Sequence, residues 1–381
     1  MIYLDNAATT CPKPPAVWEA MEDVIKNKGA NPGRSGHRLS VEAGRILWEG
    51  REMLYSFIGA EEPEEIILTS NATEALNLAI KGCLKPGDHC IITSMEHNSV
   101  ARPVYALGTA GVEFDIVEAD TEGIIRAEDI KKAIKDNTKL VAVSHGSNLT
   151  GSVQPVEEVG KICREAGVYF LVDAAQTLGV LPFNVKKLNA DMVAFPGHKG
   201  LYGPPGTGGL YLRRGLVLTP LKEGGTGGQS ETLEQPGNCP DRYESGTANT
   251  VGIAGLRAGV KFVAQLGVHH IEEKEKDLLS LMLSGLKRFD EVEVYGPQDL
   301  NKRLPVVAFN IRGRDAAEVG FILDRVYDIA VRTGLHCAPL AHRTMGTLES
   351  GAVRASLSYY NTREEVECFL RAIESIIREM T

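Results

Sequence analysis

The sequence lacks several features that would place it in a specialised class. No uninterrupted apolar run in its 381 residues approaches the roughly 20 that a membrane-spanning helix requires. Basic residues are not in excess, because 41 Lys and Arg stand against 50 Asp and Glu and give a net charge of -9. Internal repeats and low-complexity tracts are also missing. We therefore expect a globular protein with no nucleic-acid partner and no membrane partner.

Cysteine pairs are missing as well. The seven cysteines form no CxxC pair, so the sequence indicates neither a disulfide framework nor a zinc ribbon, and we expect no metal site. The first ten residues contain Asp5 and no basic-then-apolar signal pattern. A reducing cytoplasm is therefore the expected location, and there a cysteine can stay a thiol.

What the chain does contain is a regular alternation of strands and helices from about residue 64. The expected strands are EEIILTS, HCIITS, VEFDIVEA, KLVAVSH, YFLVDAAQ, DMVAFPG and GGLYLR. Segments of helical periodicity such as TEALNLAIKGC and VEEVGKICREAG lie between some of them. Nearly continuous Val, Ile and Leu runs are typical of strands buried on both faces, so the pattern predicts an α/β fold with a mostly parallel sheet between helices.

A second region begins beyond residues 222–249, which are rich in Gly, Pro and polar residues. This segment is either a mobile connector or a loop that lines a site. Two helical segments and the strands PVVAFNI and AVRASLS follow it, and that order predicts a smaller α+β domain. We expect a large domain over residues 15–253 and a small domain made of residues 1–14 and 254–381.

Polar residues follow the predicted strands at the edge where ligands of parallel sheets usually bind. Ala72 and Thr73 stand where a helix begins, and such a helix N-terminus can hold a phosphate, although the same residues are ordinary capping positions. His97 could stack on a planar ligand or lie in a polar turn. Asn148 follows the strand in VAVSH.

Asp173 and Lys199 are more specific. Asp173 ends the strand in YFLVD, where a carboxylate needs a cationic or hydrogen-bonding partner. Lys199 lies among glycines in GHKGLYGPPGTGG, where it could be exposed, bind a phosphate or form a Schiff base. Together the two residues match the needs of pyridoxal phosphate, which are a captor for its aldehyde and a partner for its pyridinium nitrogen.

Cys337 lies in TGLHCAP, a segment with no evident packing pattern. It could be a buried filler, a metal ligand or a nucleophile. A zinc site would need about four ligands and no second Cys/His cluster is present, while Gly, His and Pro neighbours fit a loop better than a core. A nucleophilic cysteine reacts as the thiolate, and His336 and Arg332 are the nearby residues that could assist it. We interpret the other six cysteines as structural.

These motifs occur together and in order. The chain resembles the fold-type I pyridoxal-phosphate enzymes of aminotransferase class V, and among them the cysteine desulfurases. The likeness rests on NATEALN, EHNS, VDAAQ, GHKGLYGP, ESGTAN, TGLHCAP and RASLSYYNT, and it covers nearly the whole chain.

The resemblance implies a contact for each part of the pyridoxal 5'-phosphate ring. Lys199 would capture the cofactor's aldehyde, and Asp173 would bind the pyridine nitrogen. Gln176 would bind the ring oxygen, and His97 would stack on the ring face. Asn148 would lie near both the ring oxygen and the substrate carboxylate.

The resemblance also implies a phosphate site. The phosphate would be held by the backbone of Ala72, by Thr73 and by His198, with a further contact from Thr247 across the interface of a homodimer. Relatives of this type often carry Ser or Thr where this chain has Pro196. One phosphate hydroxyl is therefore missing, which predicts slightly weaker cofactor retention.

Arg354 and Cys337 take the substrate roles that the resemblance implies. Arg354 would bind the substrate carboxylate, a task suited to its planar fork. Cys337 would receive sulfur from L-cysteine as a persulfide, leave L-alanine, and pass the sulfur to an acceptor protein. Only 16 residues lie between Cys337 and Arg354, which resembles the branch with a short cysteine loop that includes selenocysteine lyases. Leu335 stands where a first histidine of an HHC triplet is frequent.

Three alternatives to a cysteine desulfurase stay open. A selenocysteine lyase acting on L-selenocysteine would need the same geometry. A class V transaminase, epimerase or lyase could carry Cys337 without using it. A non-catalytic scaffold is the third alternative, and it is disfavoured by the presence of both Lys199 and Cys337.

Overall fold

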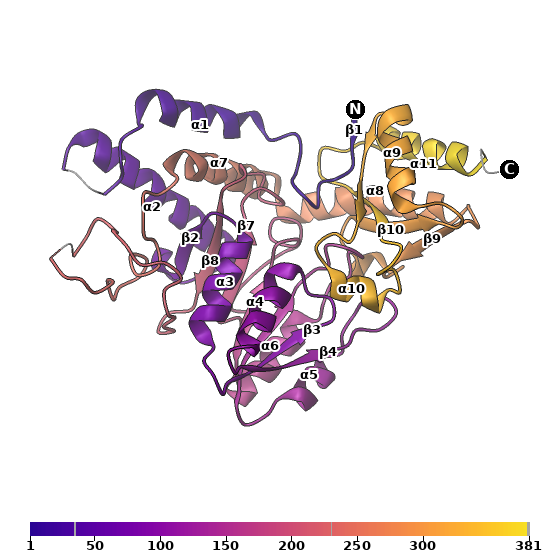
Figure 1. Ribbon diagram of the computed structural model, residues 1–381. Helices are drawn as coiled ribbons and strands as arrows, with labels where there is room; N and C mark the ends of the chain where they lie inside the picture. The colour runs from indigo at the N-terminus through magenta and orange to yellow at the C-terminus, as the bar shows by residue number, and fades with distance from the viewer. Residues whose placement is uncertain (34–35, 230, 379–381) are drawn as a thin grey trace.

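The computed structural model describes residues 1–33, 36–229 and 231–378. Its centre is a seven-stranded sheet in the order β2-β8-β7-β6-β5-β3-β4 (Figure 1). The strands are β2 (Ile66–Thr69), β3 (His89–Thr93), β4 (Glu113–Val117), β5 (Thr138–Ser144), β6 (Tyr169–Asp173), β7 (Met192–Pro196) and β8 (Gly208–Leu212). β8 runs antiparallel to β2 and β7, and the other paired strands are parallel. The predicted mostly parallel sheet is confirmed.

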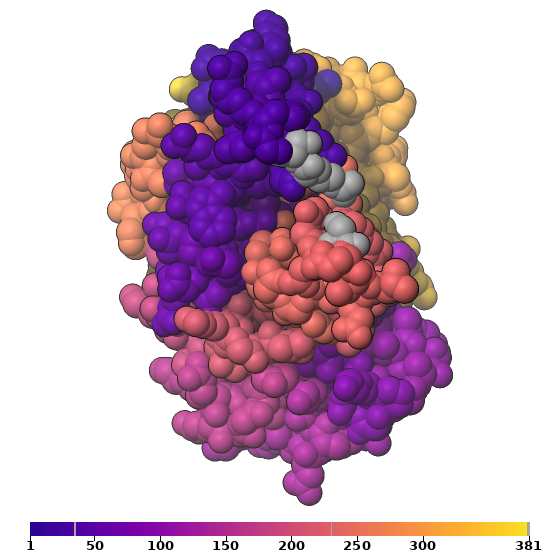
Figure 2. Space-filling view, turned by 90° about the vertical axis from the view of Figure 1, so that its left-hand side faces the viewer, coloured from indigo at the N-terminus to yellow at the C-terminus, as the bar shows by residue number. Residues whose placement is uncertain are grey.

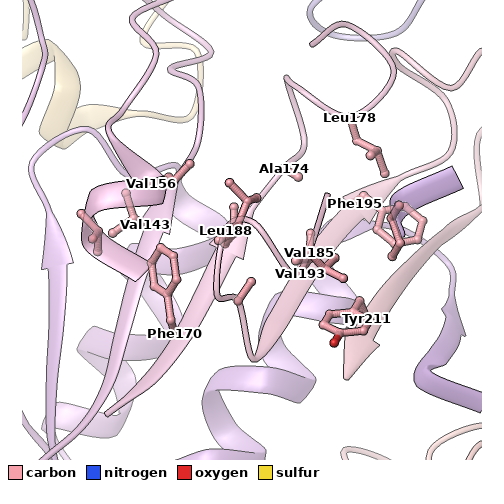
Figure 3. Close-up of a cluster of buried hydrophobic side chains, with 14 of the residues drawn as sticks. Val143, Val156, Phe170, Ala174, Leu178, Val185, Leu188, Val193, Phe195 and Tyr211 are labelled. Atoms are coloured by element: carbon pink, nitrogen blue, oxygen red, sulfur yellow. The ribbon is translucent and has the colours of Figure 1, made fainter. Parts of the chain in front are cut away.

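Continuous apolar runs form this sheet because its central strands are covered on both sides. Successive residues alternate between two cores: Val193 packs into one cluster and Ala194 into the other. Figure 3 shows part of the first cluster, in which Val143, Phe170 and Phe195 project from neighbouring strands. Every residue of β3, β7 and β8 is buried, so these strands show no alternation of apolar and polar residues.

Helices cover the sheet and the region beyond it. They are α1 (Pro15–Asn27), α2 (Arg38–Ile58), α3 (Ala72–Cys83), α4 (Asn98–Gly108), α5 (Ala127–Ala133), α6 (Val156–Ala166), α7 (Thr250–Leu266), α8 (Val268–Leu286), α9 (Ala316–Tyr327), α10 (Pro339–Thr344) and α11 (Arg363–Arg378). Local sequence sets their ends: the side chain of Asn71 caps α3 by accepting the Glu74 N–H, and Gly59 ends α2 in the left-handed conformation.

A separate antiparallel sheet follows the central one in the chain. Its order is β12-β13-β10-β9, formed by β9 (Val292–Tyr295), β10 (Val306–Ile311), β12 (Arg332–Gly334) and β13 (Ala352–Ser356). α8, α9 and α11 pack against it around a third apolar cluster. The predicted α+β region is therefore present. The predicted domain boundary between residues 253 and 254 falls inside α7 and stays a prediction.

The start of the chain lies in this second region. β1 (Ile2–Tyr3) pairs in parallel with β11 (Ile329–Ala330), and the Leu4 carbonyl accepts the Ser356 N–H at 2.7 Å. The first residues are therefore joined to strands that lie more than 300 positions later in the sequence.

The helices of the described residues include none that alone has the length and apolarity to cross a membrane. α7 and α8 have both properties only as a pair, which is bent by 79°. The Gly-rich residues 222–249 contain no helix or strand in their described part. Gln235 organises this part, because its side-chain amide donates to the Asp241 and Arg242 carbonyls at 3.3 and 3.2 Å.

Candidate active site

A pocket of about 220 Å³ lies at the carboxyl ends of β3, β5, β6 and β7. Each strand, or the loop that follows it, delivers polar residues to the pocket. The sequence-predicted residues that line the pocket are Ala72, Thr73, His97, Asn148, Asp173, Gln176, His198, Lys199 and Arg354. Ala7, Ala8, Ser99, Ser144 and Arg332 also line it, and sequence reasoning gave none of these five residues a place in the cofactor pocket.

Lys199 and Asp173 face a desolvated interior. Burial lowers the pKa of Lys199 to about 8, although the Asp173 carboxylate opposes this shift. Burial also raises the pKa of Asp173, against the Ala175 N–H that donates to its Oδ1 at 2.9 Å. A neutral amine is a nucleophile, and a buried carboxylate is stabilised by a cation placed opposite it.

His97 is held rigidly at the N-terminus of α4. Its Nδ1 accepts the Ser99 N–H at 3.1 Å and lies 2.9 Å from the Ser99 hydroxyl oxygen. Burial lowers the pKa of His97 to about 4, so the ring is neutral at physiological pH. The Ser99 hydroxyl lies 2.7 Å from that of Thr73 and thereby links the first turns of α3 and α4. Ser99 belongs to the EHNS motif, but the sequence alone does not show that its hydroxyl joins His97 to Thr73.

The N-terminus of α3 and His198 form the predicted phosphate end. Ala72 is the first residue of α3, and Thr73 follows it. The Nδ1 of His198 is buried and has no hydrogen-bond partner among the described residues. The carbonyl of His198 is fixed by the Thr10 N–H at 3.1 Å and by the Lys13 ammonium at 2.6 Å. Pro196 lines the pocket and offers no hydroxyl there.

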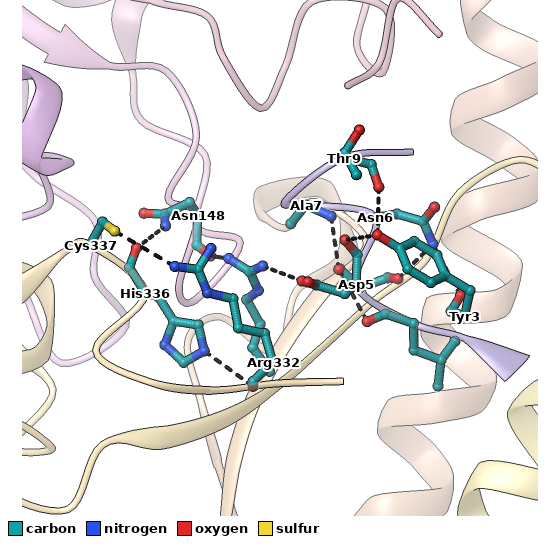
Figure 4. Close-up of polar contacts among 12 residues, drawn as sticks. Tyr3, Asp5, Asn6, Ala7, Thr9, Asn148, Arg332, His336 and Cys337 are labelled. Carbon is teal, nitrogen blue, oxygen red and sulfur yellow. Dashed lines mark hydrogen bonds and ion pairs between the residues drawn. The ribbon is translucent and has the colours of Figure 1, made fainter. Parts of the chain in front are cut away.

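Arg354 lies on β13 and lines the same pocket. Its guanidinium donates to the Asn148 carbonyl at 2.9 Å and to the Asp5 carboxylate at 2.6 Å. The Nε of Arg354 is buried and unpartnered within the described part of the chain. A donor is thus left for an incoming carboxylate. The Asn148 side chain donates to the His336 carbonyl at 2.7 Å (Figure 4) and so ties this end to the cysteine loop.

Cys337 is exposed in a tight turn between β12 and α10. Its φ is 56° and that of His336 is 51°, so two consecutive non-glycine residues are left-handed. The Cys337 carbonyl accepts the Asn98 N–H of α4 at 2.8 Å. Its sulfur lies 3.6 Å from Nη2 of Arg332, a residue that lines the pocket (Figure 4). Because Arg332 both contacts the thiol and lines the pocket, it joins Cys337 to the edge of the pocket.

The structure separates the two residues that were candidates to assist Cys337. Arg332 contacts the sulfur, whereas the buried ring of His336 bonds elsewhere. Its Nε2 lies 3.3 Å from the Arg332 carbonyl, and its Nδ1 lies 3.2 Å from Nε2 of His342. Burial lowers the pKa of His336 to about 3, so this ring is neutral and carries no charge that could attract the thiolate.

Thr247 does not reach this pocket within one chain. It is exposed and lines a different hollow together with Lys222 and Glu244. This position is compatible with a contact across a dimer interface, which stays a prediction. Cys83, Cys90 and Cys163 are buried, whereas Cys11 is exposed and does not pack in the core. No cluster of three potential metal ligands occurs in residues 1–33, 36–229 and 231–378.

Comparison with known proteins assigns the family. The model of the family described as aminotransferase class V matches residues 2–369, so the chain belongs to that family. The chain is 40% identical to a probable cysteine desulfurase of Pyrococcus abyssi, covering 100% of this chain and 95% of that one. It is 35% identical to a cysteine desulfurase of Escherichia coli, with 99% and 94% covered. The apo structure of a cysteine desulfurase from Thermococcus onnurineus NA1 superposes with a TM-score of 0.93 at 40% identity, covering 99% of this chain and 95% of that one.

Pyridoxal 5'-phosphate is the cofactor of this family, and the donor set of the pocket fits it. The unpartnered Nδ1 of His198 and the first turn of α3 suit the phosphate. The buried Asp173 suits a protonated ring nitrogen, and the amine of Lys199 suits an aldehyde. The predicted cofactor and fold class are confirmed.

Proposed function

We propose that this chain is a cysteine desulfurase that converts L-cysteine to L-alanine and receives the sulfur on Cys337. The observation that carries the proposal is the exposed Cys337 thiol, 3.6 Å from Arg332, beside a pocket lined by Lys199 and Arg354. A family fold with Lys199 alone would support many reactions of amino acids. The thiol directs the choice toward sulfur transfer.

Substrate binding begins at Arg354. Its unpartnered Nε and the nearby Asn148 place the L-cysteine carboxylate at the β13 end of the pocket. Bound pyridoxal phosphate supplies an aldehyde for the substrate amine and an electron sink for the carbon that loses its proton. Lys199 takes the proton from that α-carbon, for which a pKa of about 8 leaves a useful fraction of neutral amine. Asp173 would stabilise the positive charge on the protonated pyridine nitrogen of the cofactor.

Sulfur transfer is then a displacement at the sulfur of the substrate. The Cys337 thiolate attacks that sulfur, an S–S bond forms, and the bond between sulfur and the β-carbon breaks. The electron pair of the broken bond stays with the carbon skeleton, which is protonated and leaves as L-alanine. L-Cysteine and the Cys337 thiol therefore yield L-alanine and a Cys337 persulfide, with no external oxidant or reductant.

The test is alanine formation from L-cysteine by cofactor-loaded protein and its Cys337→Ala variant. The parent should form alanine and, with a reducing thiol present, an equal amount of sulfide, while the variant should form neither. Cys11→Ala removes the other exposed cysteine and is the matched control that should keep full activity. Equal alanine formation by the parent and Cys337→Ala would reject the proposal in favour of a class V enzyme in which the thiol is incidental. A parallel assay with L-selenocysteine ranks the two substrates.

An acceptor protein that comes to the thiol is part of the same proposal. The turn that carries Cys337 is tethered at the carbonyls of both His336 and Cys337, so the persulfide cannot travel far. Its exposure leaves the sulfur open to a docking thiol. Persulfide formed from radiolabelled L-cysteine should pass to a purified acceptor candidate faster than to dithiothreitol at equal thiol concentration. Equal rates for every candidate would count against a dedicated acceptor. Because the thiol must stay reduced between turnovers, we also propose a cytoplasmic location.

A homodimer would complete the phosphate site. α1 and α2 expose the large apolar side chains Trp18, Ile25, Val41 and Trp48. These helices lie on one face of the molecule together with residues 222–229 and 231–249 (Figure 2). Sedimentation should therefore give twice the monomer mass.

Subunit mixing tests the contribution of Thr247 to a site in the partner. Lys199→Ala subunits and Thr247→Val subunits each have one defect, and together they form sites with both residues intact. Mixing should restore cofactor retention above the level of Thr247→Val alone. Absence of restoration would show that Thr247 does not act across the interface.

A further inference from the structure

Behind the cysteine turn lies a buried chain of hydrogen bonds formed by two histidines and a threonine. The rings of His336 and His342 are nearly parallel and meet edge to edge, with centroids 5.4 Å apart and planes 7° apart. Nδ1 of His336 lies 3.2 Å from Nε2 of His342, and Nδ1 of His342 lies 2.8 Å from the Thr347 hydroxyl oxygen. Both rings are almost completely shielded from solvent, at 2% and 0% exposure.

The Arg332 carbonyl determines which group donates in each of these hydrogen bonds. Nε2 of His336 lies 3.3 Å from the Arg332 carbonyl, which can only accept, so the proton of His336 is on Nε2. Nδ1 of His336 must then accept from Nε2 of His342. That leaves Nδ1 of His342 to accept from the Thr347 hydroxyl. Burial lowers the pKa of both histidines, in agreement with two neutral rings.

This series of hydrogen bonds ends at Arg332 and His336, which position the Cys337 sulfur. Arg332 offers its carbonyl to the chain and its guanidinium to the Cys337 sulfur. His336 and Cys337 both have the left-handed backbone conformation. Non-glycine residues keep this conformation only when the surrounding structure enforces it. Leu335, directly before His336, has no hydrogen-bonding side chain and is 41% exposed. A second histidine is nevertheless present, and it arrives from α10.

We propose that His342 is a positioning residue for the nucleophile: with Thr347 it fixes the ring of His336, and through it the turn that holds Cys337 against Arg332. The inference rests on the proposed role of Cys337 as sulfur acceptor. Loss of His342 should therefore slow persulfide formation. Cofactor binding and substrate binding should continue, because Lys199 and Arg354 are not members of this series of hydrogen bonds.

The test compares His342→Ala, His342→Gln and Thr347→Val with the parent, all cofactor-loaded. The glutamine amide can replace the Nε2 donor toward His336, whereas alanine cannot. Valine has the shape of threonine without its hydroxyl. Thr344→Val is the matched control, because Thr344 is in the same helix and, among the described residues, its hydroxyl donates only to the Leu340 carbonyl, at 3.2 Å.

His342→Ala should lower kcat for alanine formation about tenfold and leave KM and the cofactor absorbance within about twofold, as expected for the loss of one buried hydrogen bond. His342→Gln should recover most of that loss, Thr347→Val should lose a smaller part, and Thr344→Val should match the parent. A parent-like kcat for His342→Ala would overturn the proposal, as would no rescue by Gln or equal effects of the two Val substitutions. If His342→Ala fails to fold, Thr347→Val against Thr344→Val decides.

A second readout requires no turnover. Iodoacetamide modification of Cys337, followed by mass spectrometry of its peptide without substrate, reports how the turn presents the sulfur. His342→Ala should modify severalfold more slowly than the parent, because the sulfur loses its place beside Arg332, and His342→Gln should lie near the parent. If these rates change as expected while no variant, the parent included, makes alanine, the positioning role stands and the proposed desulfurase function fails. Unchanged modification rates overturn the positioning role, whatever the activity.

Discussion

The carboxylate of Asp5 lies 2.6 Å from Nη2 of Arg354, a contact between the two ends of the chain. The Arg354 side chain is 1% exposed and that of Asp5 is 22% exposed. A guanidinium buried to this degree is stabilised by a counter-charge. Asp5 supplies it, and by engaging one edge of the fork it leaves Nε of Arg354 for the substrate.

Asp5→Asn should therefore destabilise the fold and weaken substrate binding together. The expected loss is about 2 kcal/mol, less than for a fully buried pair because Asp5 is partly exposed. It would appear as a lower urea midpoint, and KM for L-cysteine should rise more than kcat falls. Asp23→Asn breaks the exposed Asp23–Lys28 pair and should change neither quantity. If the two variants behave alike, Asp5 neither stabilises the buried Arg354 guanidinium nor positions it for the substrate.

Covalent capture of the cofactor by apo protein should accelerate as pH rises through about 8. The pKa of Lys199 is lowered to about 8 by burial, and only the neutral amine attacks an aldehyde. The rate at which the yellow absorbance develops after addition of pyridoxal phosphate, measured on both sides of that pH, gives the midpoint. Lys13, whose ammonium binds the His198 carbonyl, also has a pKa lowered to about 8. The same curve in Lys13→Arg, where the charge no longer titrates, should keep its midpoint.

Pro196→Ser should retain the cofactor more strongly than the parent. Pro196 lines the pocket two residues before His198, and a serine there adds a hydroxyl to the phosphate end. One hydrogen bond contributes about 1 kcal/mol net, so the dissociation constant should fall severalfold. Equilibrium dialysis of loaded protein measures it. An unchanged constant would mean that the missing hydroxyl is already compensated.

Arg332→Gln should change how charged reagents reach Cys337. The guanidinium 3.6 Å from the sulfur attracts anions, so the ratio of the rate with dianionic dithiobis(nitrobenzoate) to that with neutral dithiodipyridine should be higher for the parent than for free glutathione. The preference should fall severalfold in Arg332→Gln and in high salt. Both proteins carry Cys11→Ser, because Cys11 is also exposed. Equal slowing with both reagents would indicate a steric role of Arg332 and no electrostatic one.

Sequence periodicity was enough to locate the central sheet, because buried strands such as MVAFP are apolar at every position. Strand ends then placed Asp173 and Lys199 at one edge, since parallel strands end together. The fold class followed from these local signals.

The contacts between distant segments could not be predicted in this way. No local pattern tells that Asp5 meets Arg354, because the pair depends on the junction of β1 with β11. The choice between Arg332 and His336 depends on two left-handed φ angles that side-chain type does not encode. The contact of His342 with His336 could not be predicted either, because four residues lie between Cys337 and His342 and no motif joins them.

The junction of β1 with β11 also determines when the site can exist during synthesis. Ala7 and Ala8 line the pocket, and the Thr10 N–H holds the His198 carbonyl, yet the segment that contains them is anchored by Ala330 and Ser356. Residues 1–10 leave the ribosome long before β13 and must therefore wait for it before they can close the cofactor pocket. A truncated chain that ends before β13 would carry Lys199 and nearly all cofactor contacts, and still lack the anchor that completes the pocket. Completion of this site thus requires that synthesis has passed β13.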